Sequence, residues 1–371
     1  MKRIGITGKN GFIGTCLYNK ISLLKDEFEL VPFERSFWGS TVLTDWVKQC
    51  DIIVHLAAIN RHPDSMIIHD TNLLLVQQLI HALDDCRHCP HILFSSSIQE
   101  EQDNLYGRSK RTGRELLRVW SDKHQAPFTG MIIPNVFGPF GRPFYNSVVA
   151  TFCHQLCNNE EPQIDKDAFL QLVYVEELAD LMIDVIRKNI SISNLNVQTT
   201  GDYYVSEVLK KLQVYRELYF KQGFFPSLPD KFSVHLFNTF RSYIDHKSYF
   251  PFRLKQHTDN RGAFVEMIKL QQGGQVSFST THKGITRGNH FHTRKIERFL
   301  VMKGRALIQL RKYNTDEVLS FELDGETPSY VDMPVWYTHS IKNIGEDDLY
   351  TVFWINEHFD PKDPDTYPEI V

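Results

Sequence analysis

The sequence predicts an α/β domain with a doubly wound parallel sheet, followed by an all-β domain of the jelly-roll type. The length of 371 residues exceeds what one core usually fills. Short β-branched runs alternate with helical stretches in the first part, and short strands follow one another between turn signals in the last part. We place the boundary near 245, giving domains 1–245 and 246–371.

The composition is that of a globular protein. Hydrophobic residues make up 42%, and 41 Lys+Arg against 45 Asp+Glu leave a net charge of −4. No run of like charges or long apolar segment occurs, so we expect no nucleic-acid partner and no membrane partner. No secretory signal is recognisable at the start, and we therefore expect a cytoplasmic protein.

The first domain is expected to hold six parallel strands. Helical segments of ten or more residues between strands imply βαβ units, whose sheet is covered on both faces. The predicted strands are 3–7, 28–33, 51–56, 91–95, 129–134 and one near 170–175. In the second domain we expect strands at 274–280, 297–302, 306–313 and 350–355.

A glycine-rich turn follows the first strand and opens a helix. Its sequence is Gly8-Lys9-Asn10-Gly11-Phe12-Ile13-Gly14. Glycines at these places let the backbone turn tightly and approach a pyrophosphate, whose charge meets free N–H groups at the helix N-terminus. The turn therefore predicts a dinucleotide site, with all seven residues in contact with the cofactor.

The end of the second strand bears on the choice of cofactor. A carboxylate there would bind a ribose 2′-hydroxyl, whereas a guanidinium would accept a 2′-phosphate. The strand is expected to end in Phe33-Glu34-Arg35. Because Arg35 stands at the very end of the strand, we expect NADPH as the cofactor.

A phenol and an ammonium lie four residues apart in Tyr106-Gly107-Arg108-Ser109-Lys110, on one face of a helix. A nearby ammonium is expected to lower the pKa of Tyr106, preparing it to exchange a proton with a carbonyl or alkoxide. Such a pair is usually ordinary surface. Here it follows the serine run 95–97, which favours a catalytic role.

Together these motifs resemble the extended short-chain dehydrogenases/reductases that act on sugar nucleotides. The matching stretches are the glycine turn, His55-Leu56-Ala57-Ala58, Asn72, the serine run, Tyr106-x3-Lys110 and Asn135-Val136-Phe137-Gly138-Pro139. The resemblance implies that Ser97 binds the substrate oxygen, Tyr106 is the acid/base and Lys110 holds the nicotinamide ribose. It also places Leu56, Ala57 and Ala58 at the cofactor and Asn135 at the substrate. Only eight residues separate Ser97 from Tyr106, which is tighter than in most members.

The last third carries a cluster of potential metal ligands. The pattern is Gly284-x5-His290-x-His292-x4-Glu297-x6-Gly304, followed by Pro334-x-Trp336-x2-His339-x3-Asn343. Strand alternation points His290 and His292 to the same side, and a hairpin partner can bring Glu297 beside them. Three imidazoles and a carboxylate suit a divalent ion such as zinc.

This pattern resembles the two metal motifs of the cupin family. Asp259-x-Arg261-Gly262-x-Phe264-x-Glu266 and Gly284-x2-Arg287-Gly288-x-His290 are also similar to the deoxysugar 3,5-epimerases that share the cupin barrel. The second likeness implies a substrate site at Arg261, Glu266 and Arg287, with His290 as a metal-free base. His290 thus has two candidate roles. If it binds the metal, another group such as Tyr337 or His292 must move the proton.

A reductase and an epimerase-like cupin could both act on a single 4-keto sugar. The C4 carbonyl makes the hydrogen on C3 acidic, and this acidity is lost once the carbonyl is reduced, so epimerisation must come first. The whole chain resembles the bifunctional CapF-type enzymes of capsular-polysaccharide and O-antigen synthesis. That resemblance implies C3 epimerisation and then NADPH-dependent C4 reduction of UDP-2-acetamido-2,6-dideoxy-β-L-arabino-hexos-4-ulose to UDP-N-acetyl-L-talosamine, toward UDP-N-acetyl-L-fucosamine. The partner is thus a UDP-linked 4-keto amino sugar, and a homodimer is expected.

Two other interpretations remain open on the sequence. In the first, the chain is a 4-keto sugar reductase whose cupin only stabilises or dimerises the protein, because barrel edges often pair between subunits. In the second, the chain is a non-enzymatic NADP-sensing scaffold. Ser97, Tyr106 and Lys110 argue against a sensor, which has no use for a tuned phenol.

Overall fold

The computed structural model describes residues 1–254, 256–259, 262–265, 268–270, 274–357 and 360–371. The chain forms two compact units, one of residues 1–151 with 164–208 and one of residues 152–163 with 209–371. The expected boundary near 245 lies within the second unit, between α8 (Lys231–Arg241) and α9 (His246–Tyr249). No helix in the described part of the chain is long and apolar enough to cross a membrane.

The first unit is built on a six-stranded parallel sheet with the order β2-β1-β3-β4-β5-β8. The strands are β1 (Lys2–Thr7), β2 (Phe28–Val31), β3 (Ile52–His55), β4 (His91–Ser97), β5 (Phe128–Ile133) and β8 (Ile192–Asn196). In the sheet, β2 lies on one side of β1 and β3 lies on the other, so the strand order reverses its direction at β1. In such sheets ligands bind at the carboxyl ends of the strands on the two sides of the reversal, which here are β1 and β3.

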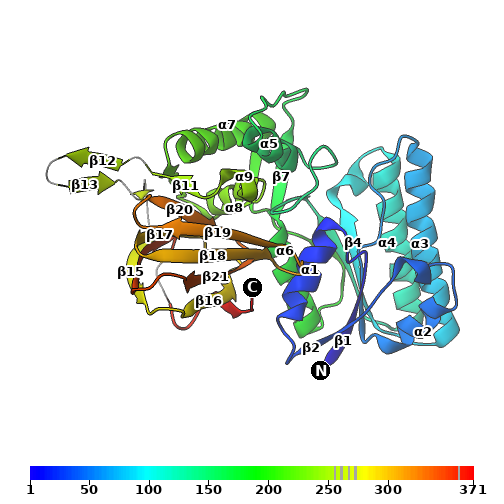
Figure 1. The fold of residues 1–371 in the computed structure, drawn as a ribbon. Helices are drawn as coiled ribbons and strands as arrows, with labels where there is room; N and C mark the ends of the chain where they lie inside the picture. Colours follow the sequence, from blue (N-terminus) through cyan, green and yellow to red (C-terminus); the bar gives the residue numbers. More distant parts are fainter. Residues whose placement is uncertain (255, 260–261, 266–267, 271–273, 358–359) are drawn as a thin grey trace. The chain divides into compact units, whose positions relative to one another are not determined.

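Helices cover both faces of this sheet, which confirms the doubly wound prediction (Figure 1). On one face α1 (Phe12–Ser22) and α6 (Val175–Lys188) pack together, and their apolar side chains share a core with β1. On the other face lie α2 (Val42–Gln49), α3 (Ser65–Cys86) and α4 (Leu105–His124). The whole of β3 is buried, as expected for a central strand that begins with three apolar residues.

The sixth strand was wrongly placed by the sequence analysis. The segment near 170–175 forms β7 (Phe169–Tyr174), which belongs to a small separate sheet with β6 (Asn135–Phe137) and β9 (Gly201–Tyr204). The sixth place in the large sheet is taken by β8, a half-exposed edge strand. Its Ser and Asn residues hide the apolar alternation by which strands are recognised.

The second unit contains two five-stranded sheets, ordered β11-β20-β17-β22-β15 and β19-β18-β21-β16-β23, whose pairings are antiparallel. This arrangement confirms the predicted jelly roll. The first sheet comprises β11 (Phe252–Arg253), β15 (Gln275–Thr281), β17 (Glu297–Lys303), β20 (Ser329–Met333) and β22 (Leu349–Ile355). The second comprises β16 (Thr286–Phe291), β18 (Arg305–Lys312), β19 (Val318–Asp324), β21 (Tyr337–Asn343) and β23 (Tyr367–Pro368).

Smaller elements complete the fold. The strand β12 (Gln256–Asp259) pairs antiparallel with β13 (Gly262–Val265), and β10 (Phe224–Phe225) pairs with β14 (Lys269–Leu270). The remaining helical segments are α5 (Val148–Cys157), α7 (Val205–Tyr215), a π-helix at Arg216–Lys221, and 3-10 turns η1 (Arg35–Phe37) and η2 (Ile98–Glu101).

A charged pair is buried inside the second unit. Arg298 on β17 and Asp332 on β20 face each other across the strands and form two hydrogen bonds of 2.7 and 3.0 Å. Both side chains are about 1% exposed or less. Arg241 of α8 lies 3.4 Å from the same carboxylate, and the Tyr330 ring stacks 3.7 Å from the Arg298 guanidinium. The single carboxylate of Asp332 is thus the counter-ion of two buried guanidinium groups.

Replacing Asp332 should destabilise the second unit strongly. The Asp332→Ala change leaves two buried guanidinium groups without their counter-ion, and we expect a loss of about 3–5 kcal/mol in the free energy of unfolding. Urea unfolding followed by tryptophan fluorescence measures it. As the control, Glu322→Gln removes an exposed pair with Arg305 and should cost less than about 1 kcal/mol. Equal costs would contradict this account.

Candidate functional site

The glycine turn sits at the carboxyl end of β1 and touches the end of β3. Gly8 has a φ of +76°, and a Cβ there would lie 2.8 Å from the Ala57 nitrogen. A Cβ on Gly14 would lie 2.2 Å from the Gly8 carbonyl oxygen, so only glycine lets α1 pack on the turn. No side-chain hydrogen bond caps the N-terminus of α1 within the described structure. This cradle fits a dinucleotide pyrophosphate.

The other residues expected at the cofactor lie around this turn. Lys9, Phe12 and Ile13 are half-buried, and Asn10 is exposed. Leu56, Ala57 and Ala58 directly follow β3 and are half-buried. The structure therefore brings the two predicted cofactor stretches to the same edge of the sheet.

A buried pair that the sequence analysis missed joins the two strand ends. Thr7 Oγ1 lies 2.8 Å from His55 Nδ1 and accepts a hydrogen bond of 3.3 Å from the Ala57 N–H. Burial, and then the charge of Lys110, lowers the pKa of His55 to about 3, so its imidazole is neutral. The sequence could have indicated this pair, because a polar residue, Thr7 or His55, ends each of the two buried strands.

Arg35 does not end the second strand. That strand stops at Val31, before Pro32, which lacks the N–H needed to continue the ladder. Arg35 instead begins η1, and both it and Glu34 are exposed. The expected strand end was thus wrong, and the preference for NADPH stays a prediction.

Ser97, Tyr106 and Lys110 lie where β4 meets α4. Ser97 is the last residue of β4, and its Oγ accepts a hydrogen bond of 3.2 Å from the Gln99 N–H. Lys110 Nζ donates to the Ser95 carbonyl at 2.8 Å and lies 5.9 Å from the centre of the Tyr106 ring. The three predicted catalytic residues therefore share the carboxyl edge of the sheet with the glycine turn.

The protonation of this group differs from the expectation. Burial raises the pKa of Tyr106 to about 12 and lowers the pKa of Lys110 to about 8. The expectation that Lys110 lowers the Tyr106 pKa was therefore wrong, because burial disfavours the charged form of each group. At neutral pH the phenol keeps its proton and can donate it.

A second missed pair explains the short spacing between Ser97 and Tyr106. Glu100 of η2 accepts hydrogen bonds from Arg114 of α4 at 2.9 and 2.7 Å, and both side chains are less than 10% exposed. A Cβ on Gly107 would lie 1.9 Å from the Gln99 carbonyl oxygen. Eight residues suffice because η2 packs directly on the helix and a buried ion pair fixes it there.

Two polar residues flank this region. Asn72 is buried, bonds both backbone groups of Ile59 and donates to Ser109 Oγ at 3.1 Å. It thereby ties the loop after β3 to α4. Asn135, expected at the substrate, is exposed on β6 and donates to the Gln171 carbonyl at 3.3 Å.

The four predicted metal ligands converge in the second unit. His290 lies on β16, His292 follows that strand, Glu297 begins β17 and His339 lies on β21. One potential ligand atom from each lies within 4.8 Å of the others. Glu297 Oε2 is 3.2 Å from His339 Nε2 and 3.6 Å from His292 Nε2.

The charges of this cluster favour a cation. Although burial opposes it, the imidazoles of His292 and His339 lower the pKa of Glu297 far below its ordinary value. Burial, together with His339 and His292, lowers the pKa of His290 to about 4. Glu297 Oε2 and Nε2 of His292 and of His339 are buried and have no hydrogen-bond partner among the described residues. A divalent ion would satisfy all three, and the nitrogen-rich donor set fits zinc.

The remaining predicted residues are less closely tied to this cluster. The Tyr337 carbonyl accepts a bond of 3.2 Å from His339 Nδ1, and burial raises the pKa of the Tyr337 phenol to about 12. Arg287 is exposed and donates to the Thr280 carbonyl at 2.8 Å. Arg261 and Glu266 lie outside the described residues.

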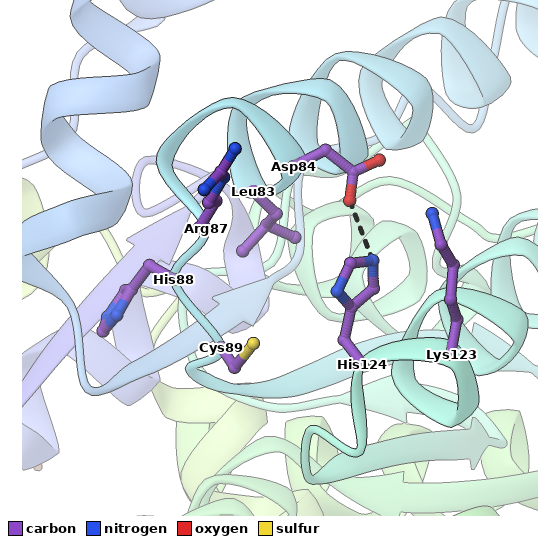
Figure 2. Close-up of a pocket in the computed structure, with 7 residues that line it drawn as sticks. All are labelled: Leu83, Asp84, Arg87, His88, Cys89, Lys123 and His124. Atoms are coloured by element: carbon purple, nitrogen blue, oxygen red, sulfur yellow. Dashed lines mark ion pairs between the residues drawn. The ribbon is translucent and has the colours of Figure 1, made fainter.

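A pocket of about 450 Å³ in the first unit is a different feature (Figure 2). It lies at the C-terminal ends of α3 and α4, before β4 begins, whereas the catalytic residues follow the other end of β4. Asp84 pairs with His124 there at 3.1 Å. Lys123 and His124 complement the negative end of the α4 dipole, which accounts for them without a ligand.

Comparison with known proteins gives two family matches. Residues 4–197 match the NAD dependent epimerase/dehydratase family, and residues 257–367 match the polysaccharide biosynthesis C-terminal domain. The expected boundary near 245 falls between the two matched stretches.

Individual relatives match over the full length. The chain is 35% identical over 369 residues to UDP-2-acetamido-2,6-beta-L-arabino-hexul-4-ose reductase of Pseudomonas aeruginosa, covering 98% of each chain. It is 33% identical to the crystal structure of capsular polysaccharide assembling protein CapF from Staphylococcus aureus, with a TM-score of 0.65 and coverage of 100% of both chains. It is also 26% identical over 123 residues to the spore coat polysaccharide biosynthesis protein SpsL of Bacillus subtilis, covering 30% of this chain and 82% of that protein. The chain therefore belongs to the NAD dependent epimerase/dehydratase family and, over its whole length, to the CapF-type proteins that join such a domain to a polysaccharide biosynthesis C-terminal domain.

Proposed function

We propose that this protein is a bifunctional nucleotide-sugar enzyme, in which the cupin unit epimerises C3 and the first unit then reduces the C4 ketone with NADPH. The observation that carries the proposal is that one chain holds both an acid/base group beside a dinucleotide cradle and a four-ligand cluster in a barrel. The substrate class follows the name of the Pseudomonas relative.

The reductase residues have distinct tasks. NADPH held at the glycine turn would supply the hydride, and the Arg35 guanidinium would donate hydrogen bonds to its 2′-phosphate. Tyr106 donates its phenolic proton to the C4 oxygen as the carbonyl becomes an alcohol, because burial keeps that proton in place at neutral pH. Ser97 donates a hydrogen bond to the same oxygen, and Lys110 holds the nicotinamide ribose.

The cupin residues act before the ketone is lost. We assign His290, His292, Glu297 and His339 to a divalent metal such as zinc, because one donor atom of each lies close to the others. A metal held by these residues would supply positive charge that stabilises the negative charge developing when the C3 proton leaves. Because burial keeps its phenol protonated at neutral pH, Tyr337 would return a proton to the opposite face of C3 after solvent water has taken up the first one. Its position two residues before His339 puts both side chains on one face of β21.

We propose a specific substrate, product and biosynthetic route for this enzyme. The substrate is UDP-2-acetamido-2,6-dideoxy-β-L-arabino-hexos-4-ulose and the product UDP-N-acetyl-L-talosamine, for capsule or O-antigen synthesis. Arg261, Glu266, Arg287 and Asn135 are proposed to contact it. We further propose a cytoplasmic homodimer.

Removing the Tyr106 hydroxyl tests the reductase. Tyr106→Phe should slow NADPH oxidation by about 10²–10⁴-fold, because the C4 oxygen loses its proton donor, while NADPH binding measured by fluorescence persists. Tyr204→Phe, on exposed β9, is the matched control and should keep full activity. Unchanged turnover in Tyr106→Phe would rule out this acid and favour a cofactor-sensing scaffold.

Deuterium exchange tests the cupin without the reductase. In D2O and without NADPH, the wild type should incorporate one deuterium at C3 of the 4-keto sugar nucleotide, read by proton NMR. His339→Ala and Tyr337→Phe should each lose most of this exchange, whereas the exposed control His282→Ala should retain it. If the wild type takes up no label, the barrel is structural and the chain is a reductase alone.

The pH profile tests the charge on Lys110. Burial lowers its pKa to about 8, so the ammonium is present below that pH and is lost above it. NADPH-dependent reduction should therefore fall as pH rises through about 8. Lys110→Arg keeps its charge at all these pH values and should move the fall upward even if the rate is lower. A flat wild-type profile to pH 10 would contradict this role.

A further inference from the structure

The C-terminal residues lie along the strand that carries His290. In β23, Pro368 pairs with His290 and Tyr367 with Phe291, and the Tyr367 and Phe291 rings stack 5.3 Å apart. The Glu369 N–H donates to the Asn289 carbonyl at 2.9 Å. The segment therefore covers the edge of β16 that β21 leaves open.

Just before this strand, the buried carboxylate of Asp365 holds the loop between β16 and β17. Its Oδ1 accepts from the N–H of Thr293 at 3.1 Å and from the Thr293 hydroxyl at 2.7 Å. Its Oδ2 accepts from the N–H groups of Arg294 and Lys295, each at 3.0 Å. The loop held in this way begins at His292 and leads to Glu297, so two of the four ligands lie at its ends.

The main chain of Asp365 also sets the protonation of a ligand. Its carbonyl oxygen lies 2.5 Å from His292 Nδ1. A carbonyl can only accept, so Nδ1 carries a hydrogen, and in the neutral imidazole the lone pair is then on Nε2. Nε2 is the buried atom that faces Glu297, which is the orientation a metal-binding imidazole needs.

We propose that Asp365 is a positioning residue of the metal centre, which fixes both the tautomer of His292 and the loop that connects His292 to Glu297. This inference rests on the proposed metal site. Its neighbours brace it, since Lys295 Nζ donates to the Pro364 carbonyl at 2.7 Å and Arg294 contacts Asp363 at 2.9 Å. The residue itself has a left-handed φ of 42°, which aspartate and asparagine adopt more readily than most residues.

Cobalt(II) is the probe for this role, because its visible absorption reports the geometry of the ligands. Metal-free protein is titrated with Co²⁺ in competition with a chelator, below the unfolding temperature of every variant. Asp365→Ala should weaken Co²⁺ binding by about 10–100-fold and alter the spectrum. Asp365→Asn keeps an acceptor oxygen and the left-handed backbone, so it should fall between Asp365→Ala and the wild type.

Asp363→Ala is the matched control. Asp363 lies on the same segment, but its exposed carboxylate binds the Arg294 guanidinium, whereas the three N–H groups of the loop bind the Asp365 carboxylate. It should bind Co²⁺ with the wild-type affinity and spectrum. A positioning role predicts that Asp365→Ala and Asp363→Ala differ, whereas general loosening of the segment would affect both alike.

The outcomes separate the inference from the proposed function. If the wild type binds no Co²⁺, the metal centre itself is wrong. If the wild type binds Co²⁺ and both Asp365 variants match its affinity and spectrum, the centre stands and the role of Asp365 is overturned. Should Asp365→Ala not fold, Asp365→Asn alone decides, and wild-type behaviour in that variant overturns the inference.

Discussion

Removal of ionisable groups from water is the constraint on which both sites depend. In the first unit, burial raises the pKa of Tyr106, which therefore stays protonated, and lowers the pKa of Lys110. In the second unit, the buried carboxylate of Glu297 keeps its charge only because imidazoles surround it. Ionisable groups are costly to bury without a partner, and the proposed cofactor, substrate and metal would each supply such a partner.

Much of the fold could be predicted from periodicity alone. The alternation of strands and helices gave the parallel sheet, and the closely spaced short strands gave the barrel, because each pattern has one common way to bury its apolar side. The failures were local. Proline ended β2 earlier than expected, and β8 went unrecognised because polar residues occupy an edge that water reaches.

The candidate sites were predictable where their residues are close in sequence. Tyr106 and Lys110 share one helix face, and His290 and His292 flank one strand end, so spacing identified them. Glu100 with Arg114, Thr7 with His55 and Asp365 with His292 meet only through the fold, up to 73 residues apart. The motif also could not predict the pKa values of Tyr106 and Lys110. The sequence places an ammonium near a phenol but does not show how far each group is buried from water.

The neutral imidazole of His55 has a consequence for tolerance to acid. In the unfolded chain this histidine takes up a proton near pH 6.5, whereas in the folded unit it does so only near pH 3. The unfolded state therefore binds more protons over this interval, and acidification favours it by about 1.4 kcal/mol for each pKa unit of difference. The buried imidazole of His55 thus makes the first unit less stable in mildly acidic surroundings, in addition to any effect of its carboxylates.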